Sequence, residues 1–404
     1  MPLTLYTCLL LLMTSGLWTI RAQDTNETVN IRSHYRKLAP SNIHFAFKLF
    51  EYLNFFAPDK NVFFSPISIS LALSMMAFSA DKETGTKILE GIGFKYSPIP
   101  ETEIHDRLQE LNHLLRQSDG NFEMSMGNTL FFKKNRRPWD LSTNNIKRYY
   151  GMENVAIDFK NWTRSISQIN EYMQNKIWGD VTDLLYALKD PTPYTLLNYI
   201  FFTGLWAQPF DPDNTKLENF FVDDKTIVKV PMMTQTSVFN FLYDPTLSCL
   251  VVQLDNVGSK TTLMVLQDRE KMDWLINELT EDTLIRWFQS IVTSHLEVHI
   301  PRLSLSGTYE LRDAMNALGI IDLKNKQTNL FGITGCSKRK LSKMLHVAKL
   351  EIKENGMEPE VSIDDSMYRK LTPTIIRFDR PFFIMVFDKV SWSILFLGKV
   401  IYPI

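Results

Sequence analysis

The sequence is poor in cysteine, with three cysteines in 404 residues. Cys8 lies in an N-terminal segment that we expect to be removed, so Cys249 and Cys336 remain. Small secreted domains with an insufficient core rely on several disulfides, and one bridge at most cannot hold together a chain of this length. A packed apolar interior must therefore stabilise the protein. Spacing alone does not determine whether the two cysteines pair, although the strand-like apolar run around Cys249 favours two separate thiols.

The short motifs of common enzymes are also missing. The chain has no Gly-x-Ser-x-Gly elbow, no glycine-rich phosphate loop and no Cys-x-x-Cys pair. His295 and His299 are the best metal candidates, but the alternating run 295–300 predicts a strand, on which their side chains lie about 13 Å apart. That is too far for one metal. We interpret both as solvent-facing strand histidines and predict no enzyme activity, metal or cofactor.

An excess of charge of one sign is absent too. Lys plus Arg is 44 and Asp plus Glu is 45, which gives a formal net charge of −1. Short basic clusters such as residues 133–137 are typical of solvated loops, and no basic run is long enough to follow a nucleic acid. We predict no nucleic-acid partner.

Long apolar runs are limited to one, at Leu3–Trp18. It is followed by small Ala22 before Gln23, which indicates a secretory signal over residues 1–22. The alternative is a membrane anchor, but the run is short for a bilayer span and lacks flanking stop-transfer charges. We expect residues 23–404 to be secreted and to have no membrane segment.

Two N-glycosylation acceptor triplets agree with export. They begin at Asn26 and Asn161. Asn26 lies just after the expected cleavage point, where the mature chain should be exposed. We predict a glycoprotein.

Hydrophobic residues, by contrast, make up 45% of the chain, enough for a sizeable core. No linker, repeat or low-complexity tract divides residues 23–404, so one domain is the simplest organisation. Residues 42–50 have helical periodicity, and Ser65-Pro66 is typical of a helix start. Strand patterns follow later in the chain, at residues 226–230, 295–300, 382–387 and 393–397. The pattern by itself predicts only a large mixed α/β domain.

Five ordered blocks between about residue 40 and the C-terminus resemble motifs of the serpin family, and chance does not plausibly produce them in this order. The blocks are Asn61–Ile69; Asn198–Phe202 with Gly204, Trp206 and Phe210; Val228–Met233; Pro301 with Tyr309, Leu318 and Gly319; and Phe378–Phe382 with Leu395–Val400 and Pro403. The C-terminal block is the most specific. The chain is thus identified as similar to serpins of clade A.

This resemblance implies a single-domain α+β serpin fold with three β-sheets, eight to nine helices and an exposed reactive-centre loop at about residues 354–376. It also implies a monomer. In the family a polar cluster, the shutter, lies where the main sheet opens, and the matching positions here are Ser65, Ser68, Asn198 and His346. We interpret His346 as a hydrogen-bonded core histidine rather than a general base.

The loop departs from the inhibitory pattern. Inhibitory serpins insert the cleaved loop as a new central strand, which requires small residues in the hinge. Here one alternating face carries Met357, Pro359, Val361 and Ile363. Proline cannot donate to a strand ladder, and by analogy with other element interiors it costs about 3 kcal/mol or more. We predict a non-inhibitory serpin that is cleaved without trapping the protease.

Family spacing places the scissile bond at Lys370-Leu371. Lys370 suits a trypsin-like protease, which is a possible partner in either case. The alternative function is therefore a serine-protease inhibitor of trypsin-like specificity that uses this bond.

Further segments, among them Glu103–His105, Met126–Asn128 and Gln208–Asp211, resemble the corticosteroid-binding globulins, a group of serpins. In that group a tryptophan stacks on the steroid and a polar residue bonds a steroid oxygen, and Trp392 and Gln253 match those positions. The resemblance places Lys389 and Arg36 at the rim. Thyroxine carriers resemble this chain less, because they have an arginine at the Trp392 position. The partner implied is a steroid hormone, a glucocorticoid or progestin.

Two positions depart from that group. Ile285 replaces a pocket residue that is usually Asn or Asp, and Glu281 replaces a nearby arginine. A steroid hydroxyl left unpaired costs about 1–3 kcal/mol, so the ligand range is expected to shift toward less polar steroids. Without the resemblance, Trp392 would be interpreted as a half-buried strand aromatic and Gln253 as an exposed strand amide.

Overall fold

The computed structural model describes most of the chain from residue 36 onward. The described ranges are 36–96, 99–116, 123–135, 140–158, 162–176, 194–267, 272–323, 328–334, 341–356 and 372–403. The expected signal segment, the glycosylation sites Asn26 and Asn161, and residues 357–371 of the expected loop lie outside them.

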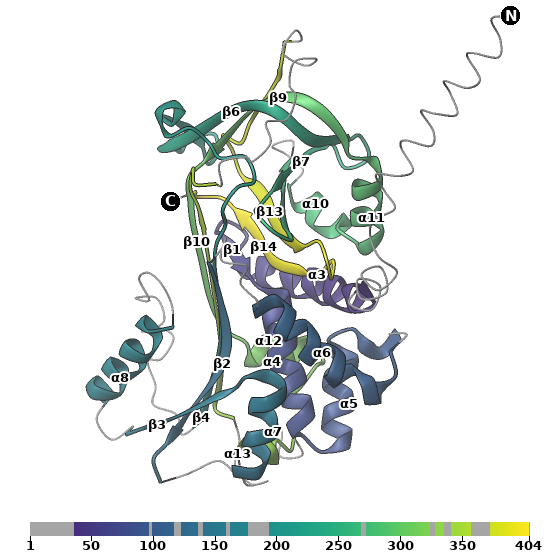
Figure 1. The fold of residues 1–404 in the computed structure, drawn as a ribbon, viewed down its shortest axis with the longest axis vertical. Coiled ribbons are helices and arrows are strands. Elements are labelled where there is room, and N and C mark those ends of the chain that lie inside the picture. Colours follow the sequence, from purple (N-terminus) through teal and green to yellow (C-terminus); the bar gives the residue numbers. More distant parts are fainter. Residues whose placement is uncertain are drawn as a thin grey trace, which may run out of the picture.

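A five-stranded sheet runs the length of the molecule (Figure 1). Its order is β10 (Leu303–Glu310), β11 (Lys343–Ile352), β4 (Tyr194–Thr203), β2 (Glu123–Lys133) and β3 (Glu153–Ile157). Strands β11 and β4 are parallel and pair along nine register positions. Every residue of β4 except Thr203 is buried, because the sheet is covered on both faces.

The second sheet has nine strands. Its path is β1 (Val62–Phe64), β14 (Ile394–Val400), β13 (Phe382–Asp388), β8 (Lys260–Gln267), β7 (Cys249–Asp255), β6 (Ile227–Asp244), β9 (Val292–Pro301) and β12 (Thr374–Arg377), with β5 (Lys216–Phe221) also paired to β6. The 18-residue β6 pairs with β5 through its first part and with β7 through its last part. The described strands therefore form two hydrogen-bonded sheets, whereas three sheets were expected. The larger sheet combines two groups of strands, because β6 pairs with strands of both groups.

Several of the helices lie beside the five-stranded sheet. Figure 1 shows α4 to α7 on one side of it and α8 on the other. The described residues contain ten α-helices, of which α12 and α13 are short, where eight to nine were expected. They are α3 (Ala39–Phe55), α4 (Pro66–Ser79), α5 (Lys82–Gly91), α6 (Glu101–Arg116), α7 (Asp140–Tyr150), α8 (Trp162–Gln174), α10 (Met272–Glu278), α11 (Glu281–Ser290), α12 (Arg312–Ala317) and α13 (Phe331–Thr334).

Local signals that the sequence carries are confirmed. Ser65 caps α4 by accepting from the Ser68 N–H at 3.2 Å, and Pro66 occupies the first turn. Strands β13 and β14, predicted from apolar runs, are buried at every position. The α+β class is thus confirmed, with a large apolar core extending through both sheets and most helices.

The interpretation of both β9 histidines as solvent-facing is wrong for His299. Its ring is 4% exposed, lies near Thr234 Oγ1 (3.1 Å) and contacts Glu297 Oε1 (2.8 Å). The strand itself is as predicted, but side chains of neighbouring strands surround the ring, among them Thr234 and Glu218.

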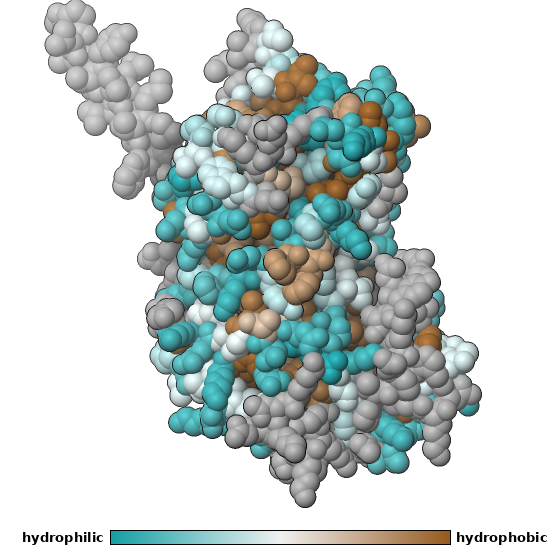
Figure 2. Space-filling model, turned by 180° about the vertical axis from the view of Figure 1, so that it is seen from behind, coloured by the Kyte–Doolittle hydropathy of each residue, from teal (hydrophilic) through white to brown (hydrophobic). Residues whose placement is uncertain are grey.

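Large exposed apolar residues occur singly over much of the surface. On the face seen in Figure 2, hydrophobic residues are interspersed with hydrophilic ones. Phe55 and Phe56, at and just after the end of α3, are the most exposed aromatic residues in the described ranges. Scattered exposure of this kind is ordinary for a folded protein.

Candidate functional site

Trp392 lies in the turn between β13 and β14, not within a strand. Its φ is +58°, a left-handed conformation that is rare for a bulky residue and costs about 1–3 kcal/mol. The Trp392 N–H donates to the Asp388 carbonyl at 2.7 Å. A strained backbone conformation persists only where contacts with the surrounding structure hold it in place.

The Asp388 carboxylate holds the turn. Its Oδ2 accepts from both the backbone N–H and the hydroxyl of Ser391, at 2.7 and 2.8 Å. Its Oδ1 accepts from Lys260 Nζ and Ser259 Oγ, each at 2.8 Å. Burial alone would raise the pKa of Asp388, but the Lys260 ammonium and these donors bring that pKa below its usual value. The buried, ionised carboxylate thereby fixes the backbone before Trp392.

Two other elements meet the Trp392 ring. The Arg36 guanidinium, from just before α3, lies 5.3 Å from the ring centroid, within range of a cation–π contact. Phe288 of α11 meets the ring edge-to-face, with centroids 4.7 Å apart. The indole is thus packed between the start of α3, the β13–β14 turn and α11.

The indole nitrogen has a buried and unused donor. Trp392 Nε1 has no hydrogen-bond partner among the described residues, and the same holds for the neighbouring Ser393 Oγ and Asn42 Nδ2. Asn42 reaches this turn from α3, because its Oδ1 accepts from the Ile394 N–H at 2.6 Å. Buried polar groups without partners cost about 1–3 kcal/mol each, and three of them occur on this turn and on the α3 residue that bonds to it.

Gln253 and Lys389 are brought together by Asp255. Gln253 Nε2 donates to Asp255 Oδ1 at 3.1 Å, and Lys389 Nζ lies 3.6 Å from the same oxygen. Lys389 stands in the turn that carries Trp392, and Gln253 stands on β7. Gln253 and Asp255 also line a cavity of about 440 Å³ together with apolar residues such as Trp206 and Phe239.

Ile285 and Glu281 lie on α11. Ile285 is 46% exposed and stands three residues before Phe288, on the same helix face. It adds an exposed apolar side chain, without a polar group, to the helix face that carries Phe288. Burial and the neighbouring Asp282 raise the pKa of Glu281, against the opposing effect of His44.

Sequence reasoning missed Phe288, Asp255, Asp388 and Lys260. Phe288 falls on the α11 face that already carried Ile285, so helical spacing could have indicated it. The Asp388–Lys260 pair is long-range, with its members 128 positions apart in the sequence, and no local pattern marks it.

The expected shutter residues form one buried cluster. Because the Ser65 N–H donates to His346 Nε2 at 3.0 Å, His346 Nδ1 carries the proton and donates to Asn198 Oδ1 at 2.6 Å. Asn198 Nδ2 then donates to Ser68 Oγ at 2.9 Å and to Asn128 Oδ1 at 2.9 Å. Burial lowers the pKa of His346 to about 3. The ring is neutral, and Asn128 is a member that sequence reasoning did not list.

Comparison with known proteins places this chain. A family model described as "Serpin (serine protease inhibitor)" matches residues 40–403. The chain belongs to the serpin family. Corticosteroid-binding globulin of Homo sapiens is 42% identical to this serpin over 405 residues, covering 100% of both chains, and that of Oryctolagus cuniculus is 44% identical over 375 residues, covering 93% of this serpin and 98% of the rabbit protein.

Solved structures give the same result. Human thyroxine-binding globulin complexed with thyroxine matches this serpin with a TM-score of 0.83 and 34% identity, covering 92% of this serpin and 99% of the other chain. Uncleaved ovalbumin, at 22% identity, covers 91% of this serpin and 100% of its own chain with a TM-score of 0.81, and shows the shared fold alone. The serpin fold expected from the sequence motifs is confirmed.

The two ends of the expected reactive-centre loop belong to the folded body of this serpin. Glu354 is buried and accepts from Thr215 Oγ1 at 2.6 Å and Arg302 Nε at 2.5 Å. Gly356 forms a bridge with Trp206, where an added Cβ would lie 2.5 Å from the Trp206 carbonyl oxygen. At the other end, residues from Thr374 form β12. Pro359, Lys370 and Leu371 lie outside the described residues.

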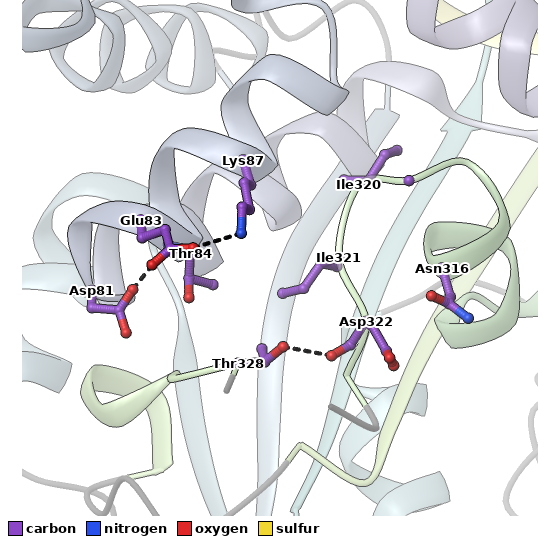
Figure 3. A pocket seen from close by; sticks show the side chains of 10 residues that line it. Asp81, Glu83, Thr84, Lys87, Asn316, Ile320, Ile321, Asp322 and Thr328 are labelled. Carbon is purple, nitrogen blue, oxygen red and sulfur yellow. Dashed lines mark hydrogen bonds and ion pairs between the residues drawn. The ribbon is translucent and has the colours of Figure 1, made fainter. Parts of the chain in front are cut away.

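One further cavity is less suited to a flat apolar ligand. A cavity of about 490 Å³ near α5 and the segment after α12 is lined by polar groups that pair with one another, such as Lys87 with Glu83 at 2.7 Å (Figure 3). In the ranges that the structure describes, no group of three metal-ligating side chains gathers. Nor does any described helix combine the length and apolar character of a bilayer span.

Proposed function

We propose that this serpin is a secreted, non-inhibitory plasma carrier of a small hydrophobic hormone, a glucocorticoid or progestin, with no enzymatic activity. The observation that carries the proposal is Trp392. Its backbone is held in a strained conformation, and its ring has a broad face toward Arg36 and an unpartnered donor. A steroid is flat and apolar with oxygens at its ends, so it suits an aromatic surface with few polar groups.

We propose a role for each of the predicted residues. Trp392 stacks on the rings of the ligand, and Arg36 lies at the rim of the site. Gln253 and Lys389 supply polar contacts near Asp255. Ile285 extends the apolar surface of α11 beside Phe288. The names of the relatives, corticosteroid-binding globulin and thyroxine-binding globulin, support hormone carriage in general, and the tryptophan favours a steroid over an acidic thyroid hormone.

Tryptophan fluorescence tests the proposal. Titration with cortisol or progesterone should quench emission, and thyroxine should bind more weakly. Replacing Trp392 with Ala should abolish the quenching and weaken binding at least about tenfold, because the stacking surface is removed. Trp274→Phe is the matched control, since Trp274 lies on α10 and is exposed. Steroid binding that persists unchanged in W392A would exclude this site.

Secretion, glycosylation at Asn26 and Asn161, and a monomeric state are part of the same proposal. The second candidate function is inhibition of a trypsin-like protease at Lys370-Leu371. The direct pairing of parallel β11 and β4 favours it, because the loop leaves the end of β11 and could fold back antiparallel between these strands. An inhibitor forms an SDS-stable complex with trypsin, whereas a carrier is only cleaved.

A further inference from the structure

Asp255 controls the orientation of the Gln253 amide. Its Oδ1 is the shared acceptor for Gln253 Nε2 (3.1 Å) and Thr261 Oγ1 (2.7 Å), with Lys389 Nζ 3.6 Å away. A carboxylate can only accept hydrogen bonds. The amide of Gln253 must therefore turn its NH₂ group toward Asp255, since the opposite orientation would place two acceptor oxygens against each other.

The consequence falls on the other end of the amide. With Nε2 engaged, Gln253 presents its carbonyl oxygen, Oε1, and within the described residues that oxygen accepts no hydrogen bond. Gln253 and Asp255 are two residues apart on β7, so their side chains share one face. Both line the cavity of about 440 Å³, which therefore offers acceptors rather than donors along this wall.

The opposite polarity is found at the Trp392 turn. There the unused group of the indole is a donor, Nε1, and the Arg36 guanidinium beside it is also a donor. Lys389 connects the two regions, because it lies in the Trp392 turn and its ammonium approaches Asp255. The Trp392 turn thus offers donors, whereas Gln253 and Asp255 offer acceptors at the cavity wall.

We propose that Asp255 is a specificity-determining residue that makes the Gln253 end of the site select a hydroxyl group, and reject a ketone, on the bound steroid. This inference rests on the proposed carrier function. A hydroxyl can donate to Gln253 Oε1, whereas a ketone places a second acceptor against it and leaves both oxygens unpaired. Sites built to bond a hydroxyl reject analogues that lack the donor much more strongly than apolar pockets reject a changed methylene.

Matched steroid pairs test the inference by tryptophan quenching. Each pair differs by hydroxyl versus ketone at one carbon: cortisol and cortisone, testosterone and androstenedione, and 20α-hydroxyprogesterone and progesterone. In the wild-type protein the hydroxyl member of at least one pair should bind about tenfold more tightly. Asp255→Asn should reduce that ratio to within about twofold, because an asparagine can accept from or donate to Gln253 and so frees the amide to turn.

Two further variants keep the result interpretable. Asp59→Asn, at an exposed aspartate beyond α3, is the matched control and should keep the wild-type ratio. Gln253→Leu removes the amide without touching Asp255 and should also abolish the hydroxyl preference, which provides the test if D255N does not fold.

The possible outcomes are separable. Steroid quenching that depends on Trp392 but shows no hydroxyl preference in any pair overturns the role of Asp255 and leaves the carrier proposal intact. A preference that survives in both D255N and Q253L also overturns it. Absence of quenching by all six steroids overturns the carrier proposal and this inference together.

Discussion

At the scale of single residues, one aspartate shapes each end of the candidate site. Asp388 holds the Trp392 turn from beneath, through Lys260 and Ser391, and Asp255 sets the Gln253 amide. Both carboxylates act by fixing the orientation of hydrogen-bond donors and acceptors on neighbouring residues. Neither therefore needs an extensive contact with the ligand itself. Their effects differ, because Asp388 is buried whereas the Asp255 side chain is 40% exposed.

Asp388→Asn should weaken both stability and steroid binding. It leaves the Lys260 ammonium buried without a charged partner, which costs about 3–5 kcal/mol, and it loosens the turn, so affinity should fall at least about tenfold. Urea unfolding and fluorescence titration measure the two effects. In a cycle with Lys260→Met, the double variant should recover part of the stability but not the affinity. If D388N binds steroid like the wild type, the turn does not position Trp392.

At the scale of elements, the β11–β4 pair is held at its centre by a polar cluster. His346 and Asn198 are register partners on the two parallel strands, and both ring nitrogens of His346 are used. These hydrogen bonds can break when the two strands separate and can re-form with the same partners when the strands pair again. Apolar contacts between the strands would not specify their partners as closely. We propose that the cluster is the point at which this sheet opens.

The neutral His346 should make stability fall in acid. Its pKa is about 3 in the folded state and about 6.5 when unfolded, so the unfolded state binds more protons between these values. Stability due to this group is therefore fully present above about pH 6.5 and is lost progressively down to about pH 3.

Urea unfolding of His346→Gln checks this expectation. The free energy of unfolding should vary less steeply with pH between 6 and 4, by up to about 1.4 kcal/mol per pH unit. His113→Gln, at an exposed helix position, is the control. Equal slopes in H346Q and the wild type would contradict the assignment of a neutral core histidine.

At the scale of the whole molecule, the choice between carrier and inhibitor function depends on whether the expected reactive-centre loop can enter the five-stranded sheet. The hinge is anchored through Glu354 and Gly356 near the end of β11, and the place for an inserted strand is between β11 and β4, which are parallel and pair directly. An inserted strand would have to carry Pro359 in its interior. The expected result is a loop that is cut but stays out.

Trypsin treatment examines this directly. We expect cleavage at Lys370-Leu371, no SDS-stable complex on a gel, and a melting temperature of the cleaved protein within a few degrees of the intact one. Pro359→Ala, which removes the ring, should shift the balance toward insertion and raise the melting temperature after cleavage. A hyperstable cleaved wild type with covalently trapped trypsin would establish the inhibitor instead.

The sequence by itself determined the family and many local elements. Ordered motifs predicted the fold, Ser65-Pro66 predicted the start of α4, and the apolar runs at 382–387 and 393–397 predicted buried strands, because capping and hydrophobic period depend on neighbours in the chain. The family resemblance also identified the residues of the polar cluster and Trp392, because it assigns a role to each matching position of the sequence.

Only the tertiary structure decided what surrounds those positions. It placed Trp392 in a strained turn rather than a strand, buried His299, joined two groups of strands through β6, and set Asp255 and Asp388 as the residues that orient the candidate site. Several of these features depend on contacts between distant segments, such as Thr234 with His299, 65 positions apart, and Lys260 with Asp388, 128 positions apart. Local periodicity in the sequence predicts which side chains face the core. The residue that each of them contacts there is determined only by the folded chain, because the two residues can lie far apart in the sequence.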